Sequence, residues 1–268
     1  MFNTLKEKIS THVNGIFHDG DVEVTIYPTY GFLQNSDWLI PFRGWVHQNR
    51  RLPNHLINEL AQAAIHCDDA EISNFSSRFD DFSDDSRSRQ LVTIQFDTDD
   101  ERHTFQLSDL NGLIEMTVKV SAAKAQTLLA QQNSADEWLR FSVVSEGHRG
   151  EGRVNLIQPN GLSLVSDIDD TIKITEVPGE KSVVLKNTFC RDFVSLREMS
   201  EKYRSLGNVA FHYVSGGPWQ LYQPLSAFLE GAGFPAGTFH LNYFPKNFLS
   251  EDTRSLLIDS IYCDLTGG

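Results

Sequence analysis

The stretch that orders the rest of this sequence is Leu162-Ser163-Leu164-Val165-Ser166-Asp167-Ile168-Asp169-Asp170-Thr171-Ile172. A glycine precedes it, and its alternating and β-branched apolar residues predict a short buried strand. Three carboxylates follow at the C-terminal end of that strand, which is where open α/β sheets place their ligands. We therefore expect a sheet with a ligand site at this end.

The spacing of the carboxylates suggests which ligand the site takes. Asp167 and Asp169 are two residues apart, so a regular strand would point both to one face. Two such charges repel each other unless a cation lies between them. A hard ion such as Mg²⁺ prefers carboxylates, carbonyls and waters and leaves room for a phosphate. The Thr171 hydroxyl is placed to tie the turn back to the first carboxylate.

Two plainer interpretations compete with a phosphotransfer site. A calcium loop does not fit, because no glycine stands at the required offset and no closing glutamate follows in register. A simple acidic turn usually follows a strand that faces water, whereas residues 162–165 are expected to be buried.

A second segment supports phosphate binding. Residues 209–214 predict another buried strand, which ends at Ser215 and turns through Gly216-Gly217-Pro218 into a helix over residues 219–229. A hydroxyl and free backbone N–H groups at a helix start suit a phosphate. The alternative is a simple strand-to-helix turn. With a helix expected over residues 192–206, the strand–helix–strand order predicts a parallel sheet.

The pattern Asp-x-Asp-x-Thr after a buried strand resembles the first motif of the haloacid-dehalogenase superfamily of aspartate-nucleophile phosphatases. More narrowly, the chain resembles the Mg²⁺-dependent phosphatidate phosphatases of the fungal actin-patch-protein type, best over residues 150–245. The residues that carry this resemblance are Ser166-Asp167-Ile168-Asp169-Asp170-Thr171-Ile172-Lys173, Asn187-Thr188-Phe189 and Tyr213-Val214-Ser215-Gly216-Gly217-Pro218-Trp219-Gln220-Leu221-Tyr222.

The resemblance implies hydrolysis of phosphatidate to diacylglycerol and phosphate, on a haloacid-dehalogenase-like core. Asp167 would be the nucleophile that forms an aspartyl-phosphate, and Asp169 the general acid and base. Mg²⁺ would be held partly by Asp167 and by Asp169 through its backbone carbonyl. Thr171, Ser215 and Gly216 would bind the substrate. Asp170 is left open as a neighbour of the site or a surface acid.

The superfamily also needs a cation and a further acid, and here the chain departs from the family pattern. Lys246 and Arg254 are the available cations, and we take Lys246 as the substrate-binding one. The family's Gly-Asp-Ser-Gly-Glu string does not occur. Residues 256–258 followed by Asp259 and Asp264 copy its layout, either as a degenerate motif or by accident. We expect Asp259 as the third metal ligand and a catalytic domain that is apparently truncated. The alternative is a catalytically incomplete member that acts as a lipid- or protein-binding module.

The chain before residue 158 has a different character. Short alternating segments predict a mostly antiparallel β-rich domain over residues 1–158, followed by the catalytic domain over residues 159–268. A helix is expected over residues 54–67 and an irregular exposed segment over residues 73–88. In the second domain, the superfamily implies a short helical turn and a β-hairpin flap within residues 173–186.

Composition limits the partners. A net charge of −13 argues against nucleic acid and against a purely electrostatic hold on anionic lipid. No stretch approaches a membrane span, so we expect a cytoplasmic protein and leave peripheral membrane contact open. The cysteines Cys67, Cys190 and Cys263 lack metal-like spacing and are expected to be reduced.

Overall fold

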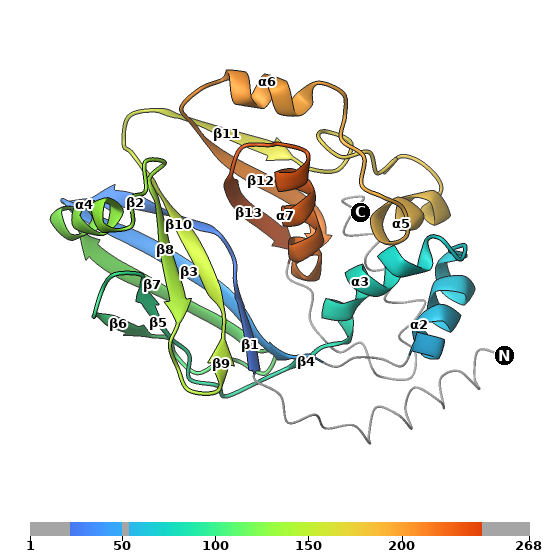
Figure 1. The fold of residues 1–268 in the computed structure, drawn as a ribbon, viewed down its shortest axis with the longest axis horizontal. Coiled ribbons are helices and arrows are strands. Elements are labelled where there is room, and N and C mark those ends of the chain that lie inside the picture. Colours follow the sequence, from blue (N-terminus) through green and yellow to red (C-terminus); the bar gives the residue numbers. More distant parts are fainter. Residues whose placement is uncertain (1–21, 50–53, 243–268) are drawn as a thin grey trace.

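The computed structural model describes residues 22–49 and 54–242, and its strands form two separate sheets (Figure 1). The larger sheet has ten strands, all from residues 22–157. These are β1 (Val22–Ile26), β2 (Thr29–Gln34), β3 (Asp37–Gln48), β4 (Asp85–Ser86), β5 (Thr93–Phe96), β6 (Arg102–Thr104), β7 (Leu113–Ser121), β8 (Trp138–Val143), β9 (His148–Arg149) and β10 (Glu151–Ile157).

Strand β3 is the centre of this larger sheet. It pairs antiparallel with β1, β2, β4 and β7. The pairs β1–β9 and β10–β2 are parallel, so the sheet is mixed although most of its pairs are antiparallel. Alternate residues of β3, among them Trp38, Ile40 and Phe42, are buried in its core, as the period of a half-buried strand requires.

The second sheet is parallel throughout. Its strands are β11 (Leu162–Asp167), β12 (Val209–Pro218) and β13 (Gly237–Asn242), in that order across the sheet. Asp167 aligns with Val214, which aligns with His240. The parallel arrangement predicted from the strand–helix–strand order is confirmed, and the chain as described is a mixed α/β protein with one large mixed sheet and one parallel sheet.

Strand β11 is less buried than the sequence predicts. Leu162 is 73% exposed and Val165 68% exposed, and within the strand only Ser166 is buried. Among the described strands β11 pairs with β12 alone, so it lies at an edge of the sheet. The prediction that residues 162–165 are buried is wrong for this part of the chain, because apolar content indicates strand formation but not position within a sheet.

The helices follow the sequence in part. They are α2 (Asn54–Leu60), the π-helical turn η1 (Ala61–Ile65), α3 (Ile72–Ser83), α4 (Ala122–Gln131), α5 (Lys181–Phe189), α6 (Met199–Ser205), the 3₁₀ turn η2 (Trp219–Leu221) and α7 (Tyr222–Gly231). The helices expected over residues 54–67 and 219–229 are therefore present, each interrupted or preceded by a non-α turn. The helix expected over residues 192–206 is confined to α6.

Helix α3 corrects the irregular segment expected at residues 73–88. Phe75, Phe79 and Phe82 recur at four- and three-residue spacing, which places them on one helical face, and their rings stack in sequence. Phe82 then meets Phe189 at the end of α5 edge to face. The many Ser and Asp residues favoured the prediction of an irregular segment, although the three phenylalanines have helical spacing.

Helix α5 begins in the segment where a short helical turn and a β-hairpin flap were expected, and residues 173–186 form no hairpin. Its C-terminal end is fastened to α3, because the Arg78 guanidinium donates to the carbonyls of Thr188 (3.2 Å) and Arg191 (2.6 Å). Cations are favoured at such helix ends, where the last carbonyls lack partners.

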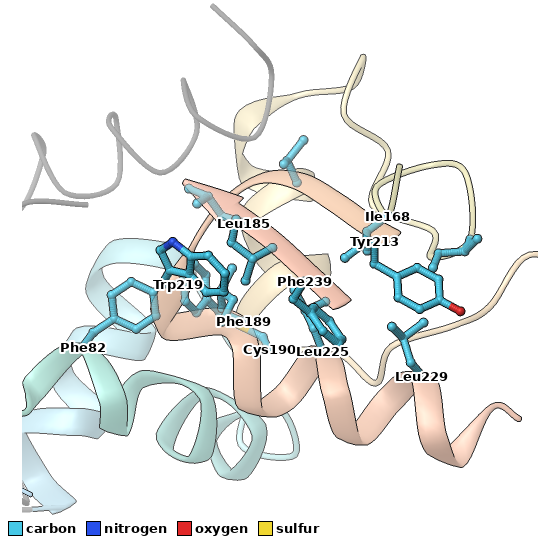
Figure 2. Close-up of a cluster of buried hydrophobic side chains, with 14 of the residues drawn as sticks. Phe82, Ile168, Leu185, Phe189, Cys190, Tyr213, Trp219, Leu225, Leu229 and Phe239 are labelled. Carbon is cyan, nitrogen blue, oxygen red and sulfur yellow. The ribbon is translucent and has the colours of Figure 1, made fainter. Parts of the chain in front are cut away.

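One hydrophobic core joins helices from the first half of the chain to the parallel sheet. Figure 2 shows Phe82, Phe189 and Trp219 at one end of this cluster and Tyr213 and Leu229 at the other. Cys67 and Cys190 lie in the same core and form a disulfide, so the prediction that they are reduced is wrong. They are 123 residues apart, and spacing alone could not show that η1 and α5 converge. Cys263 lies outside the described residues.

Gly112 provides a test of the large sheet. Its φ is +76°, and an added Cβ would lie 2.4 Å from the Val46 carbonyl oxygen, which is backbone and cannot move away easily. Gly147 has a similar φ of +73° but open space around it. We expect Gly112→Ala to lower the melting temperature clearly more than Gly147→Ala, whose cost of about 1 kcal/mol is conformational alone. Thermal unfolding of both variants checks this; equal effects would contradict the close approach.

Candidate active site

Asp167 is the last residue of β11, and its side chain is exposed at the C-terminal end of the parallel sheet. The Thr171 hydroxyl donates to Asp167 Oδ2 at 3.1 Å, which is the turn-closing bond expected from the sequence. Backbone bonds from Ile172 and Lys173 to the Ile168 carbonyl close the same turn. The strand end and the turn together hold an open carboxylate in a defined position.

The Asp167 carboxylate has an electrostatically unfavourable environment. Partial burial raises the pKa of its carboxyl above the ordinary value, and the negative charges of Asp169 and Asp170 raise it further. The hydrogen bonds from the Thr171 hydroxyl and the Ile168 backbone lower it, but by less. A cation beside Asp167 would offset this repulsion.

Asp169 is held quite differently from Asp167. Its Oδ2 accepts from the Ser215 hydroxyl at 2.7 Å, and its Oδ1 accepts from the Thr175 hydroxyl at 2.7 Å. The strand ends at Asp167, so alternation along a strand does not apply to Asp169. The prediction that Asp167 and Asp169 point to one face of a strand therefore does not apply, because only Asp167 is in the strand. The structure instead joins Asp169 to Ser215 at the end of the neighbouring strand.

Lys173 is a member of this site that the sequence analysis did not assign. Its ammonium lies 3.0 Å from Asp169 Oδ1 and also donates to the Thr175 hydroxyl, and only 2% of its side chain is exposed. Burial lowers the pKa of Lys173, while the Asp169 carboxylate opposes that effect. The signal available in the sequence was the four-residue spacing from Asp169, which lets the side chain turn back on the carboxylate across a single turn.

Asp170 organises the loop after the turn. Its carboxylate accepts from the backbone N–H groups of Thr175 (2.8 Å), Glu176 (2.7 Å) and Val177 (2.6 Å). Burial pushes the pKa of Asp170 upwards, but these three backbone bonds outweigh it and hold the pKa below the ordinary value. Asp170 is thus a carboxylate next to the site whose bonds are all directed at the backbone of its own loop.

The last part of β12 completes the described site; the strand runs on through Ser215 to Pro218, with a register shift between Val214 and Pro218, where the sequence predicted a turn. The Gly217 N–H donates to the Ser215 hydroxyl at 2.9 Å, and the Asn242 amide at the end of β13 donates to the Gly216 carbonyl at 2.9 Å. Ser215 is buried, and the segment around Gly216 is thereby fixed to all three strands. Lys246, Arg254, Asp259 and Asp264, to which the sequence analysis gave roles, lie outside the described residues.

A carboxylate at a strand end, beside an acid bonded to the serine of the next parallel strand, defines a candidate site for phosphoryl transfer. Comparison with known proteins agrees. Residues 162–258 match the family described as "Phosphatidate phosphatase APP1, catalytic domain". The resemblance to the APP1-type phosphatidate phosphatases is thereby confirmed for this part of the chain.

Two fungal proteins show the same similarity. The phosphatidate phosphatase APP1 of Saccharomyces cerevisiae is 38% identical over 101 residues, which cover 36% of this chain and 17% of that protein. An uncharacterised protein of Schizosaccharomyces pombe is 29% identical over 133 residues, or 48% of this chain and 21% of that protein. The matched part of the chain thus spans about a fifth of each relative.

In the described part of the chain, no helix has the length and apolar character to span a membrane.

The contrast between Asp167 and Asp170 gives a stability prediction. A carboxyl whose pKa is raised by folding destabilises the fold above that pKa, and the cost disappears below the ordinary value of 3.8. A carboxyl whose pKa is lowered does the opposite, and its contribution is lost as the pH falls through the lowered pKa. At pH 7 with EDTA, we expect Asp167→Asn to raise the melting temperature and Asp170→Asn to lower it by a few degrees.

Scanning calorimetry of the two variants beside the wild type measures these shifts. The substitutions are chemically the same and lie three residues apart, so each is the control for the other. Shifts in the same direction would contradict the electrostatic assignment.

Proposed function

We propose that this protein is a Mg²⁺-dependent phosphatidate phosphatase, which hydrolyses phosphatidate to diacylglycerol and phosphate through an aspartyl-phosphate on Asp167. The observation that carries the proposal is the open Asp167 carboxylate at the end of β11, next to an Asp169–Ser215 pair at the end of β12. The activity for which the Saccharomyces cerevisiae relative is named supports the substrate class.

The residues present suit a divalent metal ion. Partial burial, and after it the like charges of Asp169 and Asp170, raise the pKa of Asp167, and a hard cation would stabilise its carboxylate against both. The Asp167 carboxylate and the Asp169 backbone carbonyl would hold Mg²⁺ in part, with Asp259 as the further acid. When bound, the ion would offset the charge of the nucleophile and the phosphate.

The reaction has two steps, the formation of the aspartyl-phosphate and its hydrolysis. Asp169 is protonated on Oδ2 once Ser215 has released that oxygen. A carboxylate oxygen of Asp167 attacks phosphorus, the bond from phosphorus to the glyceride oxygen breaks, and Asp169 gives its Oδ2 proton to the glyceride oxygen. Asp169, now ionised, takes a proton from water, whose oxygen attacks the phosphorus of the aspartyl-phosphate and releases inorganic phosphate. Asp167 is thereby regenerated as a carboxylate and Asp169 as the acid.

Ser215 couples substrate binding to the acid. A hydroxyl has one hydrogen, and Ser215 uses it on Asp169 Oδ2 while accepting from the Gly217 N–H. Ser215 cannot donate to a phosphate oxygen without releasing Asp169. Substrate binding would therefore free Asp169 Oδ2 to face the leaving oxygen, with Lys173 and Thr175 still holding Oδ1.

Other parts of the proposal rest on the family resemblance. Thr171, Ser215, Gly216 and Lys246 would contact the phosphate, on a haloacid-dehalogenase-like core over residues 159–268 that follows a β-rich domain over residues 1–158. The protein would act in the cytoplasm and meet membranes peripherally.

The two catalytic acids can be separated by substitution. We expect Asp167→Asn to abolish phosphate release by several orders of magnitude, because an amide cannot form the phosphoenzyme. Asp169→Asn should slow hydrolysis of phosphatidate far more than that of nitrophenyl phosphate, whose leaving group needs no proton. Steady-state phosphate release from both substrates measures this. An Asp167→Asn protein that keeps most of the wild-type rate would overturn the assignment.

Substrate and metal preference give a further prediction. We expect phosphate release from phosphatidate in detergent micelles to exceed release from glycerol 3-phosphate, to stop with EDTA and to return with Mg²⁺. Equal or faster turnover of glycerol 3-phosphate would indicate a general phosphatase. A folded wild-type protein that is silent on every phosphomonoester would instead favour the catalytically incomplete, lipid- or protein-binding alternative.

A further inference from the structure

A cavity of about 460 Å³ lies between the large sheet and the parallel sheet. Its size is typical of sites that enclose part of a small organic ligand. Its lining comes from the β1–β2 connection, β3, β7, the start of η2 and β13. The lining residues that the argument uses are Tyr27, Tyr30, Glu115, Thr117, Trp219 and His240.

Aromatic contacts across this interface shape the cavity. Tyr27 stacks on Trp219 with ring centroids 3.8 Å apart, so an aromatic pair forms one wall. Tyr30 contacts the ring of His212 edge to face at 5.4 Å and lies 6.4 Å from that of His240. These contacts anchor the large sheet on one face of the parallel sheet and place aromatic rings along this wall.

The charged groups at the cavity cancel one another. The Arg43 guanidinium pairs with the Glu115 carboxylate at 2.6 Å on the exposed side. Burial lowers the pKa of His240, and the charge of Arg43 lowers it further, so the neutral form of this imidazole is favoured. The lining therefore carries no net charge, which suits an apolar ligand and not an anionic one.

The cavity lies beside the candidate active site. Asp167, Val214 and His240 are in register on three adjacent parallel strands, so their side chains leave the same face of the sheet. Two strand spacings separate His240 from Asp167, or about 10 Å between Cα atoms. At the other end of the cavity, Trp219 follows Ser215 by only four residues. A phosphate at Asp167 would thus place the rest of its molecule within reach of the cavity.

We propose that this cavity binds an acyl chain of the lipid whose phosphate is cleaved at Asp167. This proposal rests on the proposed function. It explains how the protein would prefer a lipid phosphate to a small phosphate ester. An acyl chain gains about 0.8 kcal/mol for each methylene that it buries. Glycerol 3-phosphate has no chain and would leave the cavity unused.

The test fills the cavity from β7. Thr117→Trp places an indole at its lining, and tryptophan is well accepted in strands. Thr104→Trp on β6 is the matched control, because it makes the same change at an exposed strand position outside the cavity. Glu115→Trp, two residues away on the same face of β7 and also at the cavity lining, is a second filling variant in case the first does not fold. Circular dichroism and thermal unfolding confirm that each protein is native.

Two measurements are made on the full chain. Binding of a dansyl-labelled fatty acid is followed by dansyl fluorescence, excited beyond the tryptophan absorption. Turnover is compared for soluble dihexanoyl phosphatidate and for nitrophenyl phosphate. We expect a filling variant to weaken fatty-acid binding about tenfold. The kcat/KM for dihexanoyl phosphatidate, divided by the kcat/KM for nitrophenyl phosphate, should fall by a similar factor. Thr104→Trp should match the wild type in both.

The two proposals fail in different ways. Fatty-acid binding that is the same in the wild type and a folded filling variant would overturn the cavity assignment, whatever the turnover. A wild type that binds the fatty acid in the cavity but releases no phosphate would overturn the proposed activity and leave the cavity as a lipid site.

Discussion

The buried carboxylate of Asp169 is the constraint on which the candidate site depends. Lys173, Thr175 and Ser215 all donate to it, and each comes from a different place: the turn after β11, the loop beyond it and the end of β12. Removing one partner of a buried ion pair typically costs about 3–5 kcal/mol. The pair therefore fixes the turn that presents Asp167, and it links two strands at the edge where substrate would bind.

Support for this arrangement comes from outside the matched segment. Helix α3, from the first half of the chain, packs its aromatic face on α5 and holds the end of α5 through Arg78. The disulfide between Cys67 and Cys190 joins the same two regions. Further along α5, Asn187 donates to the Thr175 carbonyl. Residues before β11 are thus part of the core that positions Asp169. The N-terminal region therefore contributes to the structure of the site as well as forming the large sheet.

Some of the site was predictable because its chemistry is local. The Asp167–Thr171 bond follows from a four-residue turn, and the placement of Ser215 beside the acidic turn follows from parallel strands that end at one edge. The burial of Asp169 and its pairing with Lys173 were not predictable in the same way. They depend on where the strand ends and on Phe193, whose ring lies 4.9 Å from the Lys173 ammonium.

The sequence by itself determined most of the longer strands, the parallel pairing of β11 with β12 and the acidic turn, because these depend on periodicity, breakers and short-range spacing. It also carried the family motifs. Only the tertiary structure decided that β11 is an edge strand among those described, that a Ser- and Asp-rich segment is a helix, that Cys67 meets Cys190, and that a cavity lies beside Asp167. Each of these depends on contacts between residues far apart in the chain, and no local pattern encodes which distant surfaces will pack together.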